Sequence, residues 1–145
     1  MKIVIINGPN LDMLGIREKK LYGDQTYRAL VDLCKKEGKK RKINVTCFQS
    51  NSEGKIIDKI HSCYRKADGI IINAGGYTHT SVAILDALKA VAVLTVEVHI
   101  TDINAREGYR KVSYISEYAA KTICGHGFNG YIEAMDYIME QKNVD

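Results

Sequence analysis

The 145-residue sequence predicts an α/β fold in which helices cover both faces of a five-stranded parallel sheet. Apolar, β-rich runs alternate with segments of helical periodicity, which is typical of repeated strand–helix units. The runs are continuously apolar, as is usual for parallel strands that are buried on both faces. No repeat, low-complexity tract or linker interrupts the pattern, so we expect a single domain over residues 1–145.

The strands and helices follow from the apolar pattern in chain order. We expect strands at Lys2–Asn7, Ile43–Phe48, Gly69–Ala74, Val93–His99 and approximately Thr122–Cys124. Apolar residues recur at helical spacing after the first, second, third and fifth of these, in the sets Tyr27, Leu30, Val31 and Cys34; Ile56, Ile57, Ile60 and Tyr64; Val82, Leu85 and Leu88; and Ile132, Met135 and Met139. Five βα units of this kind predict a doubly wound, flavodoxin-like, three-layer α/β/α sandwich. Ligands of such folds bind at the carboxyl ends of the strands.

The composition argues against a membrane protein, a secreted protein and a nucleic-acid binder. No stretch approaches the roughly 18 apolar residues of a membrane span, and the apolar run Ile3–Ile6 is too short for a signal peptide. The net charge of +4 is mild, and its one cluster, Lys35–Lys42, lacks the aromatic partners or reader motif of a nucleic-acid site. We interpret that cluster as a solvated helix end. The four cysteines are scattered, so we expect reduced thiols in a cytoplasmic protein.

Polar and glycine-rich segments end or follow every predicted strand. They read NGPN, QSNSEG, NAGGYTHTS, EVHITD and GHGFNG in chain order. Because the carboxyl ends of parallel strands meet at one edge of the sheet, we expect these segments to form one site there.

Glu97 and His99 lie two residues apart on the predicted fourth strand, so their side chains point to the same face. A carboxylate beside an imidazole fixes its tautomer and stabilises its protonated form, which suits a general acid. A metal pair is an alternative, although a zinc site needs three ligands with matched spacing. A solvated ion pair at a strand end explains the motif equally well.

The segment after the third strand contains Asn73, Gly75, Gly76 and His79. An asparagine at the end of a central strand is a buried amide that needs hydrogen-bond partners, and a ligand or the protein itself could supply them. The two glycines allow the backbone to approach a ligand closely, and a hydroxyl among Thr78, Thr80 and Ser81 could cap the next helix. By itself, His79 is better explained as a surface residue.

Four further polar residues lie near the same edge. Arg106 and Arg110, spaced by four, are expected on one helical face, where two cations indicate an anionic ligand. Arg17 and Tyr22 lie in the segment Leu11–Asp24, whose length is typical of a loop that closes over a site. Taken singly, all four are also typical of a solvated surface.

The segment Gly125–Gly130 reads GHGFNG and fits the GxGxxG pattern of dinucleotide-binding loops. No second strand follows it, and no acidic residue about 20 positions on could reach a ribose. We therefore interpret its glycines as serving tight turns and close helix packing.

Together these segments resemble the type II 3-dehydroquinate dehydratase family. The matching motifs are NGPNLDMLGIRE followed by YG, QSNSEGKIIDKIH, INAGGYTHTSVAILDAL, VEVHITDINAREGYR followed by SYIS, and GHGFNGY, which run from residue 7 to about residue 131. The resemblance implies reversible anti elimination of water from 3-dehydroquinate to 3-dehydroshikimate through an enolate, without metal or organic cofactor. It also implies a homo-oligomer built from trimers, usually a dodecamer.

The resemblance assigns catalytic roles by position. Tyr22 resembles the base that removes the proton beside the ketone, and Arg17 and Arg106 resemble the cations that favour its ionised form. An ordinary tyrosine has a pKa near 10, so only about one in a thousand is ionised at pH 7. Each unit of depression costs about 1.4 kcal/mol, which neighbouring guanidinium groups can supply.

Asn10 resembles the residue that holds a water against the enolate oxygen, and His99, oriented by Glu97, resembles the acid that protonates the leaving hydroxyl. The resemblance further implies a set of substrate-binding residues, with Asp86 supplied by a neighbouring subunit. They are Asn73, Gly75, Gly76, His79, Asp86, Ile100, Thr101, Arg106 and Arg110.

Three positions depart from the family pattern. Thr101 stands where Ser is common, Asp102 where Asn is common, and Lys19 where Pro is common.

Two other classes of protein remain open. The alternatives are an aldose–ketose isomerase of similar fold, which would need a phosphate cradle, and a non-catalytic flavodoxin-like ligand-binding or receiver module. A receiver would need clustered acids after the first strand, where this sequence has NGPN.

Overall fold

Five parallel strands form one sheet in the order β2-β1-β3-β4-β5. The structure, a computed structural model, describes residues 1–16, 20 and 25–144. The strands are β1 (Lys2–Asn7), β2 (Asn44–Gln49), β3 (Gly69–Asn73), β4 (Thr95–His99) and β5 (Lys121–Cys124). The strand order reverses beside β1, which puts the topological switch point between β1 and β3. The predicted doubly wound α/β fold is confirmed.

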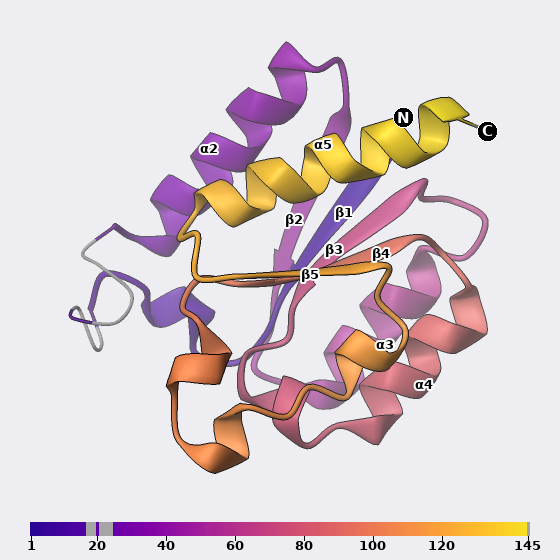
Figure 1. The fold of residues 1–145 in the computed structure, drawn as a ribbon. Helices are drawn as coiled ribbons and strands as arrows, with labels where there is room; N and C mark the ends of the chain where they lie inside the picture. The colour runs from indigo at the N-terminus through magenta and orange to yellow at the C-terminus, as the bar shows by residue number, and fades with distance from the viewer. Residues whose placement is uncertain (17–19, 21–24, 145) are drawn as a thin grey trace.

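Helices cover both faces of the sheet (Figure 1). One face carries α2 (Tyr27–Lys40) and α5 (Asn129–Val144), and the other carries α3 (Glu53–Ser62) and α4 (Val82–Val91). The side chains of Thr26, Ser52 and Ser81 cap the first turns of α2, α3 and α4 by accepting a hydrogen bond from a backbone amide. Of the three hydroxyls proposed as the cap of the helix after the third strand, the structure uses Ser81.

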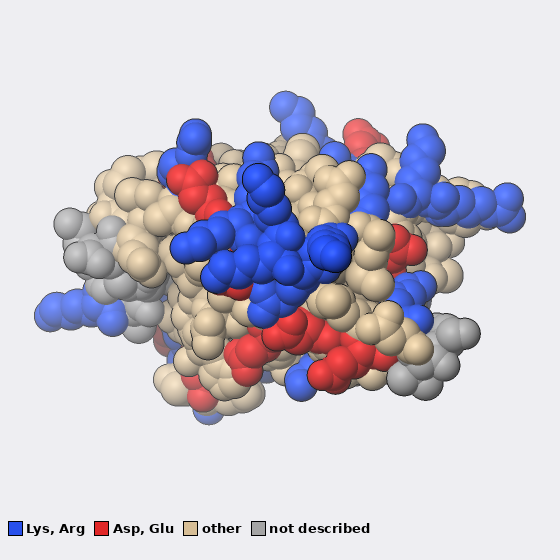
Figure 2. All heavy atoms as spheres, turned by 90° about the horizontal axis from the view of Figure 1, so that it is seen from above, with Lys and Arg blue, Asp and Glu red and all other residues tan. Residues whose placement is uncertain are grey.

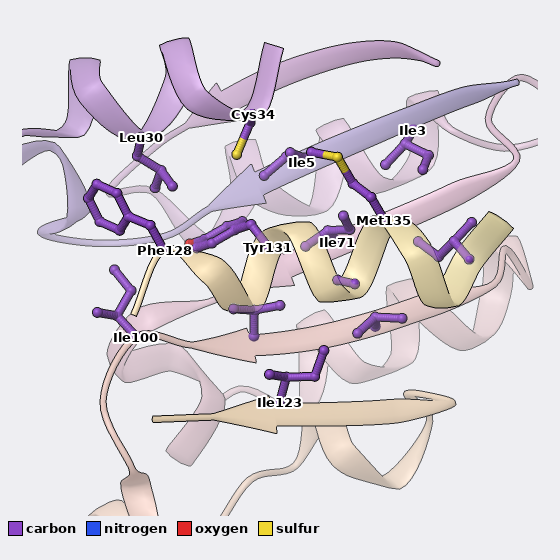
Figure 3. Packing of buried hydrophobic residues seen from close by; sticks show 14 of the residues in the cluster. Ile3, Ile5, Leu30, Cys34, Ile71, Ile100, Ile123, Phe128, Tyr131 and Met135 are labelled. Carbon is purple, nitrogen blue, oxygen red and sulfur yellow. The ribbon is translucent and has the colours of Figure 1, made fainter. Parts of the chain in front are cut away.

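Each face of the sheet has its own apolar core. On one side, Ile5 of β1 packs in a cluster with Leu30 of α2 and with Tyr131 and Met135 of α5 (Figure 3). On the other side, Ile6 of β1 packs in a cluster with residues of α3 and α4. Successive residues of β1 are therefore buried on opposite faces, which explains why its sequence is continuously apolar.

The connection from β4 to β5 differs from the prediction. It contains three short 3-10 helices, η3 (Ile103–Ala105), η4 (Gly108–Arg110) and η5 (Ile115–Glu117), where the fourth βα unit would need an α-helix. The expectation that Arg106 and Arg110 share one helical face was therefore wrong, because Arg106 ends η3 and Arg110 lies in η4. Apolar residues are too sparse here to bury the face of an α-helix against the sheet.

The basic run Lys35–Lys42 closes α2, as expected, and its lysines are exposed. Arg41 donates to Asp136 of α5 and to Glu37, each at 2.6 Å. Figure 2 views the top of Figure 1 and shows basic side chains gathered in the middle of that face with acidic side chains beside them. The four cysteines are free thiols. Within the described ranges, no helix has the length and apolarity that a membrane crossing requires.

Candidate active site

A pocket opens at the carboxyl edge of the sheet, where the sequence predicts a site. Its volume is about 160 Å³, which is below the roughly 300–1,000 Å³ of sites for drug-sized ligands and suits a small molecule. The lining residues are Pro9, Asn10, Leu11, Asn73, Gly75, Gly76, His79, His99, Ile100, Thr101, Ile103, Arg106 and Arg110. Most of the predicted site residues are therefore brought together.

The loops after β1 and β3 pack against each other through their backbones. A Cβ atom on Gly8 would lie 2.3 Å from the carbonyl oxygen of Ala74, a distance that no side chain can adopt without movement. The Gly8 amide donates to the Asn73 carbonyl at 2.8 Å. Gly75 has a φ of 60°, in the left-handed region that favours glycine. Glycines at these positions thus place two loops of the pocket in direct contact.

Asn10 reaches the pocket from the loop after β1. Its φ of 69° and ψ of −3° are left-handed, a conformation that asparagine tolerates better than most residues. Its backbone amide donates to Asn51 Oδ1 at 3.0 Å, and Gln49 Nε2 donates to the same oxygen at 3.1 Å. The ends of β1 and β2 are thereby tied together, and the Asn10 side chain remains exposed beside the pocket.

The Asn73 side chain is held by a buried network at the ends of β1 and β3. Asn7 and Asn73 are paired in register on these strands. Tyr131, which is fully buried on α5, donates its hydroxyl to Asn7 Oδ1 at 2.6 Å and accepts from Asn73 Nδ2 at 3.1 Å. The Gly75 amide donates to Asn73 Oδ1 at 3.2 Å. The Asn73 amide is therefore fixed in one orientation at the pocket wall. Burial raises the pKa of Tyr131 well above its ordinary value.

Glu97 is fully buried, and its carboxylate is surrounded by donors. Oε2 accepts from Thr78 Oγ1, from Ser113 Oγ at 2.6 Å and from His99 Nε2 at 2.8 Å, while Oε1 accepts from Thr122 Oγ1 at 3.1 Å. Burial acts to raise the pKa of this carboxyl. The hydrogen bond and charge of His99, with the hydroxyl donors, outweigh burial, so the pKa lies below its ordinary value. Glu97 is therefore an ionised carboxylate inside the protein.

His99 stands between this carboxylate and the pocket. Since a carboxylate only accepts, Nε2 of His99 donates to Glu97, and the hydrogen bond fixes the orientation of the ring. The ring is 7% exposed and lines the pocket, so Nδ1 is the nitrogen left for a ligand. An imidazolium in this position can donate a proton into the pocket while Glu97 balances its charge. Within residues 1–16, 20 and 25–144, no three His, Cys, Asp or Glu side chains are grouped to hold a metal ion.

Other lining residues make the wall of the pocket cationic. Nδ1 of His79 lies 2.6 Å from the Val112 carbonyl and therefore donates to it, which leaves Nε2 for a ligand. The Nε atoms of Arg106 and Arg110 lie 3.7 and 3.3 Å from Glu107 Oε2. This carboxylate is 56% exposed, so solvent screens it and the wall remains favourable for an anion.

Among the described residues, two predicted site residues do not line the pocket, namely Asp86 and Glu97, which is buried and bonded to His99. Asp86 is exposed on α4. Arg17 and Tyr22, the predicted cation and base, lie outside the described residues, as does Lys19. Asp102, which stands where Asn is common in the family, caps η3 by accepting from the Asn104 amide at 3.0 Å.

Sequence reasoning missed the residues that support the site from behind. Asn7 and Tyr131 orient Asn73, while Ser113 and Thr122 bind Glu97. Asn7 could have been noticed as a polar residue that ends an otherwise apolar strand. Ser113 and Thr122 are 16 and 25 residues from Glu97, and no local pattern links them to it.

The fold and the pocket define an α/β protein with an acid–base pair and a cationic wall at the topological switch point. The family model described as class II dehydroquinase matches residues 1–139. A 3-dehydroquinate dehydratase of Fusobacterium nucleatum is 54% identical, with 99% of each chain covered, and one of Clostridium perfringens is 52% identical, with 94% of each covered. The crystal structure of the type II dehydroquinase from Butyrivibrio crossotus superposes with a TM-score of 0.94 at 48% identity, covering 96% of this chain and 97% of that one. The chain belongs to the class II dehydroquinase family.

Proposed function

We propose that this protein is a 3-dehydroquinate dehydratase that eliminates water in the anti sense through an enolate. The observation that carries the proposal is the buried Glu97 carboxylate bonded to His99 Nε2 at the wall of a small, cationic pocket. The relatives named above support the substrate, and the geometry supports the acid half of the chemistry.

The substrate is a carboxylate with several hydroxyls, and the pocket offers suitable partners for both. The Asn73 amide and the backbone amides of Ile100 and Thr101 form the proposed carboxylate cradle. His79 and Arg110 are the proposed hydroxyl ligands. Gly76 lines the pocket and has open space where a Cβ would stand, so its backbone is accessible to the substrate.

The reaction begins with removal of the proton beside the ketone, for which Tyr22 is the proposed base, assisted by Arg17 and Arg106. The electron pair moves onto the ketone oxygen, and a water held by Asn10 stabilises the resulting enolate. His99 then donates its proton to the hydroxyl, which leaves as water while the enolate returns to the ketone. The product is a conjugated enone. Tyr22 has gained one proton from the substrate, and His99 has given one proton to the leaving water.

The test is to mix the purified protein with 3-dehydroquinate and to follow the ultraviolet absorbance of the enone. We expect the absorbance to rise with the parent protein and to rise about 10²- to 10⁴-fold more slowly with His99→Ala, because general acid catalysis contributes about that much. An aldose–ketose isomerase or a non-catalytic module gives no enone. A folded parent protein that leaves the substrate unchanged would contradict the proposal.

We also propose that the protein works in the cytoplasm as a homo-oligomer of trimers that assemble into a dodecamer, as the family resemblance implies. Asp86 supports the shared site, because it is exposed on α4 and absent from the pocket of its own chain. Val82 on the same helix is 50% exposed, and Val112 beside the pocket is 52% exposed. Large apolar side chains exposed in this way suit burial against another copy of the chain.

A further inference from the structure

The carboxylate of Glu97 depends on two hydroxyls that come from outside its own strand. Thr78 lies in η2 (Gly75–His79), and Ser113 lies between η4 and η5. Both donate to Glu97 Oε2, the same oxygen that accepts from His99. Hydrogen bonds to a charged group are stronger than those between neutral groups, and burial strengthens them further.

Neighbouring groups hold the hydroxyls of Thr78 and Ser113 beside the Glu97 carboxylate. Their oxygens lie 3.0 Å apart, and Ser113 Oγ also accepts from the Ser116 amide at 3.1 Å. Because an ionised carboxylate can only accept, the Ser113 hydroxyl donates its hydrogen to Glu97 while its oxygen accepts from the Ser116 amide. Thr78 is fully buried, so its hydroxyl has no alternative in solvent.

The backbone around Ser113 is fixed to the same wall of the pocket. The Val112 carbonyl accepts from His79, and the Tyr114 amide donates to the Thr78 carbonyl at 2.8 Å. Ser113 therefore lies between two main-chain anchors, and it connects the segment that contains Arg106 and Arg110 to the buried carboxylate.

We propose that Thr78 and Ser113 are positioning residues, whose hydroxyls hold the Glu97 carboxylate in place and so keep His99 oriented for proton donation into the pocket. The inference deepens the proposed function and rests on His99 as its acid. Without these donors, burial of the Glu97 carboxylate would be less compensated, and the carboxyl would take up a proton more readily. A neutral Glu97 no longer balances an imidazolium.

Other titratable and charged groups lie near Glu97 and His99, and the substitutions described below leave them unchanged. Cys124 on β5 interacts electrostatically with Glu97. The groups that share the pocket wall with His99 are His79, Arg106 and Arg110.

The experiment compares Thr78→Val, which keeps the shape of the side chain and removes the hydroxyl, with Thr78→Ser, which keeps the hydroxyl. Thr80→Val is the matched control, because Thr80 is exposed two residues further on. We expect kcat for 3-dehydroquinate to fall about 10- to 100-fold in Thr78→Val, the equivalent of one hydrogen bond to a charged group. KM should change little. Thr78→Ser should recover most of the rate, and Thr80→Val should match the parent.

A second variant and a second measurement make the test independent of folding and of the substrate. Ser113 is half-buried, so Ser113→Ala disturbs the core less than a change at Thr78. It should also lower kcat, as Thr78→Val does. The carboxyl of Glu97, titrated by NMR without substrate, should take up its proton at a higher pH in both variants than in the parent, because a hydroxyl donor to the carboxylate is lost. Parent-like kcat and an unshifted titration would overturn the inference. Equal losses in Thr78→Ser and Thr78→Val would also overturn it, since the retained hydroxyl of serine would then fail to recover the rate. Failure of the parent to form the enone contradicts the proposed function alone, because the NMR titration still tests the hydroxyls.

Discussion

The Tyr131 hydroxyl would be costly to bury without partners, and both of its partners are asparagines at the ends of adjacent strands. The Gly75 amide can only donate, so the Asn73 atom that faces it is the oxygen, and Nδ2 faces Tyr131. One hydroxyl on the last helix thus determines how a pocket residue presents its amide.

Removing that hydroxyl should weaken substrate binding. In Tyr131→Phe the ring still fills the core, while Asn7 and Asn73 each lose a buried partner. We expect KM for 3-dehydroquinate to rise about tenfold and the free energy of unfolding to fall by about 1–3 kcal/mol. Steady-state kinetics and urea unfolding measure these effects. Tyr137→Phe, a half-buried tyrosine on the same helix, is the control. An unchanged KM would mean that Asn73 is oriented without Tyr131.

Tyr22 should be the residue on which proton removal depends. Tyr22→Phe keeps the ring and removes the ionisable oxygen, so we expect kcat to fall by at least about 10²- to 10⁴-fold. Circular dichroism should show an unchanged fold. Turnover within tenfold of the parent, roughly 1.4 kcal/mol of barrier, would place the base elsewhere.

Glu97 should also make stability depend on pH. Its pKa in the folded protein lies below the ordinary value, so its contribution to stability is present above the unfolded pKa and is lost as pH falls through the folded pKa. We expect Glu97→Gln to be less stable than the parent by on the order of 2 kcal/mol near pH 6, with a smaller difference near pH 3. Urea unfolding at both pH values measures this. A difference that stays constant would show that the charge of Glu97 does not stabilise the fold.

At the scale of elements, the contact between the loops after β1 and β3 should be sensitive to one methyl group. A Cβ on Gly8 would meet the Ala74 carbonyl, whereas a Cβ on Gly76 would meet nothing within 4 Å. We expect Gly8→Ala to lower the free energy of unfolding by about 1–3 kcal/mol or more, as overpacking does, and Gly76→Ala to change it little. Equal effects in urea unfolding would mean that the two loops separate at low cost.

The strands could be predicted because burial on both faces leaves a continuous apolar run, as in Gly69–Asn73. The β4–β5 connection could not, because its conformation depends on anchors such as the bond between the Tyr114 amide and the Thr78 carbonyl. The same distinction applies to the site. Glu97 and His99 share a strand face, which spacing reveals, but the donors to Glu97 arrive from η2, β5 and the segment around Ser113. Such contacts join residues that only the folded chain brings together.

At the scale of the whole molecule, the position of Asp86 requires a second chain if this carboxylate is to bind substrate. It lies on α4, five residues after the cap Ser81, and it is exposed and outside the pocket of its own chain. In a closed ring of three chains, each α4 can face the pocket of its neighbour, where Asp86 can balance Arg110 and accept from a substrate hydroxyl.

Mixing two inactive variants tests this shared site. In Tyr22→Phe the base is missing and Asp86 is intact, and in Asp86→Ala the reverse holds. If subunits exchange at random in equal amounts, about one quarter of the sites combine an intact Tyr22 with an intact Asp86 from the adjacent chain, and activity returns to about that fraction of the parent. Each variant must be inactive alone, and exchange must be verified by mass spectrometry of the mixed oligomer. Mixed oligomers without activity, or a fully active monomer in sedimentation at assay concentration, would show that each chain forms a complete site by itself.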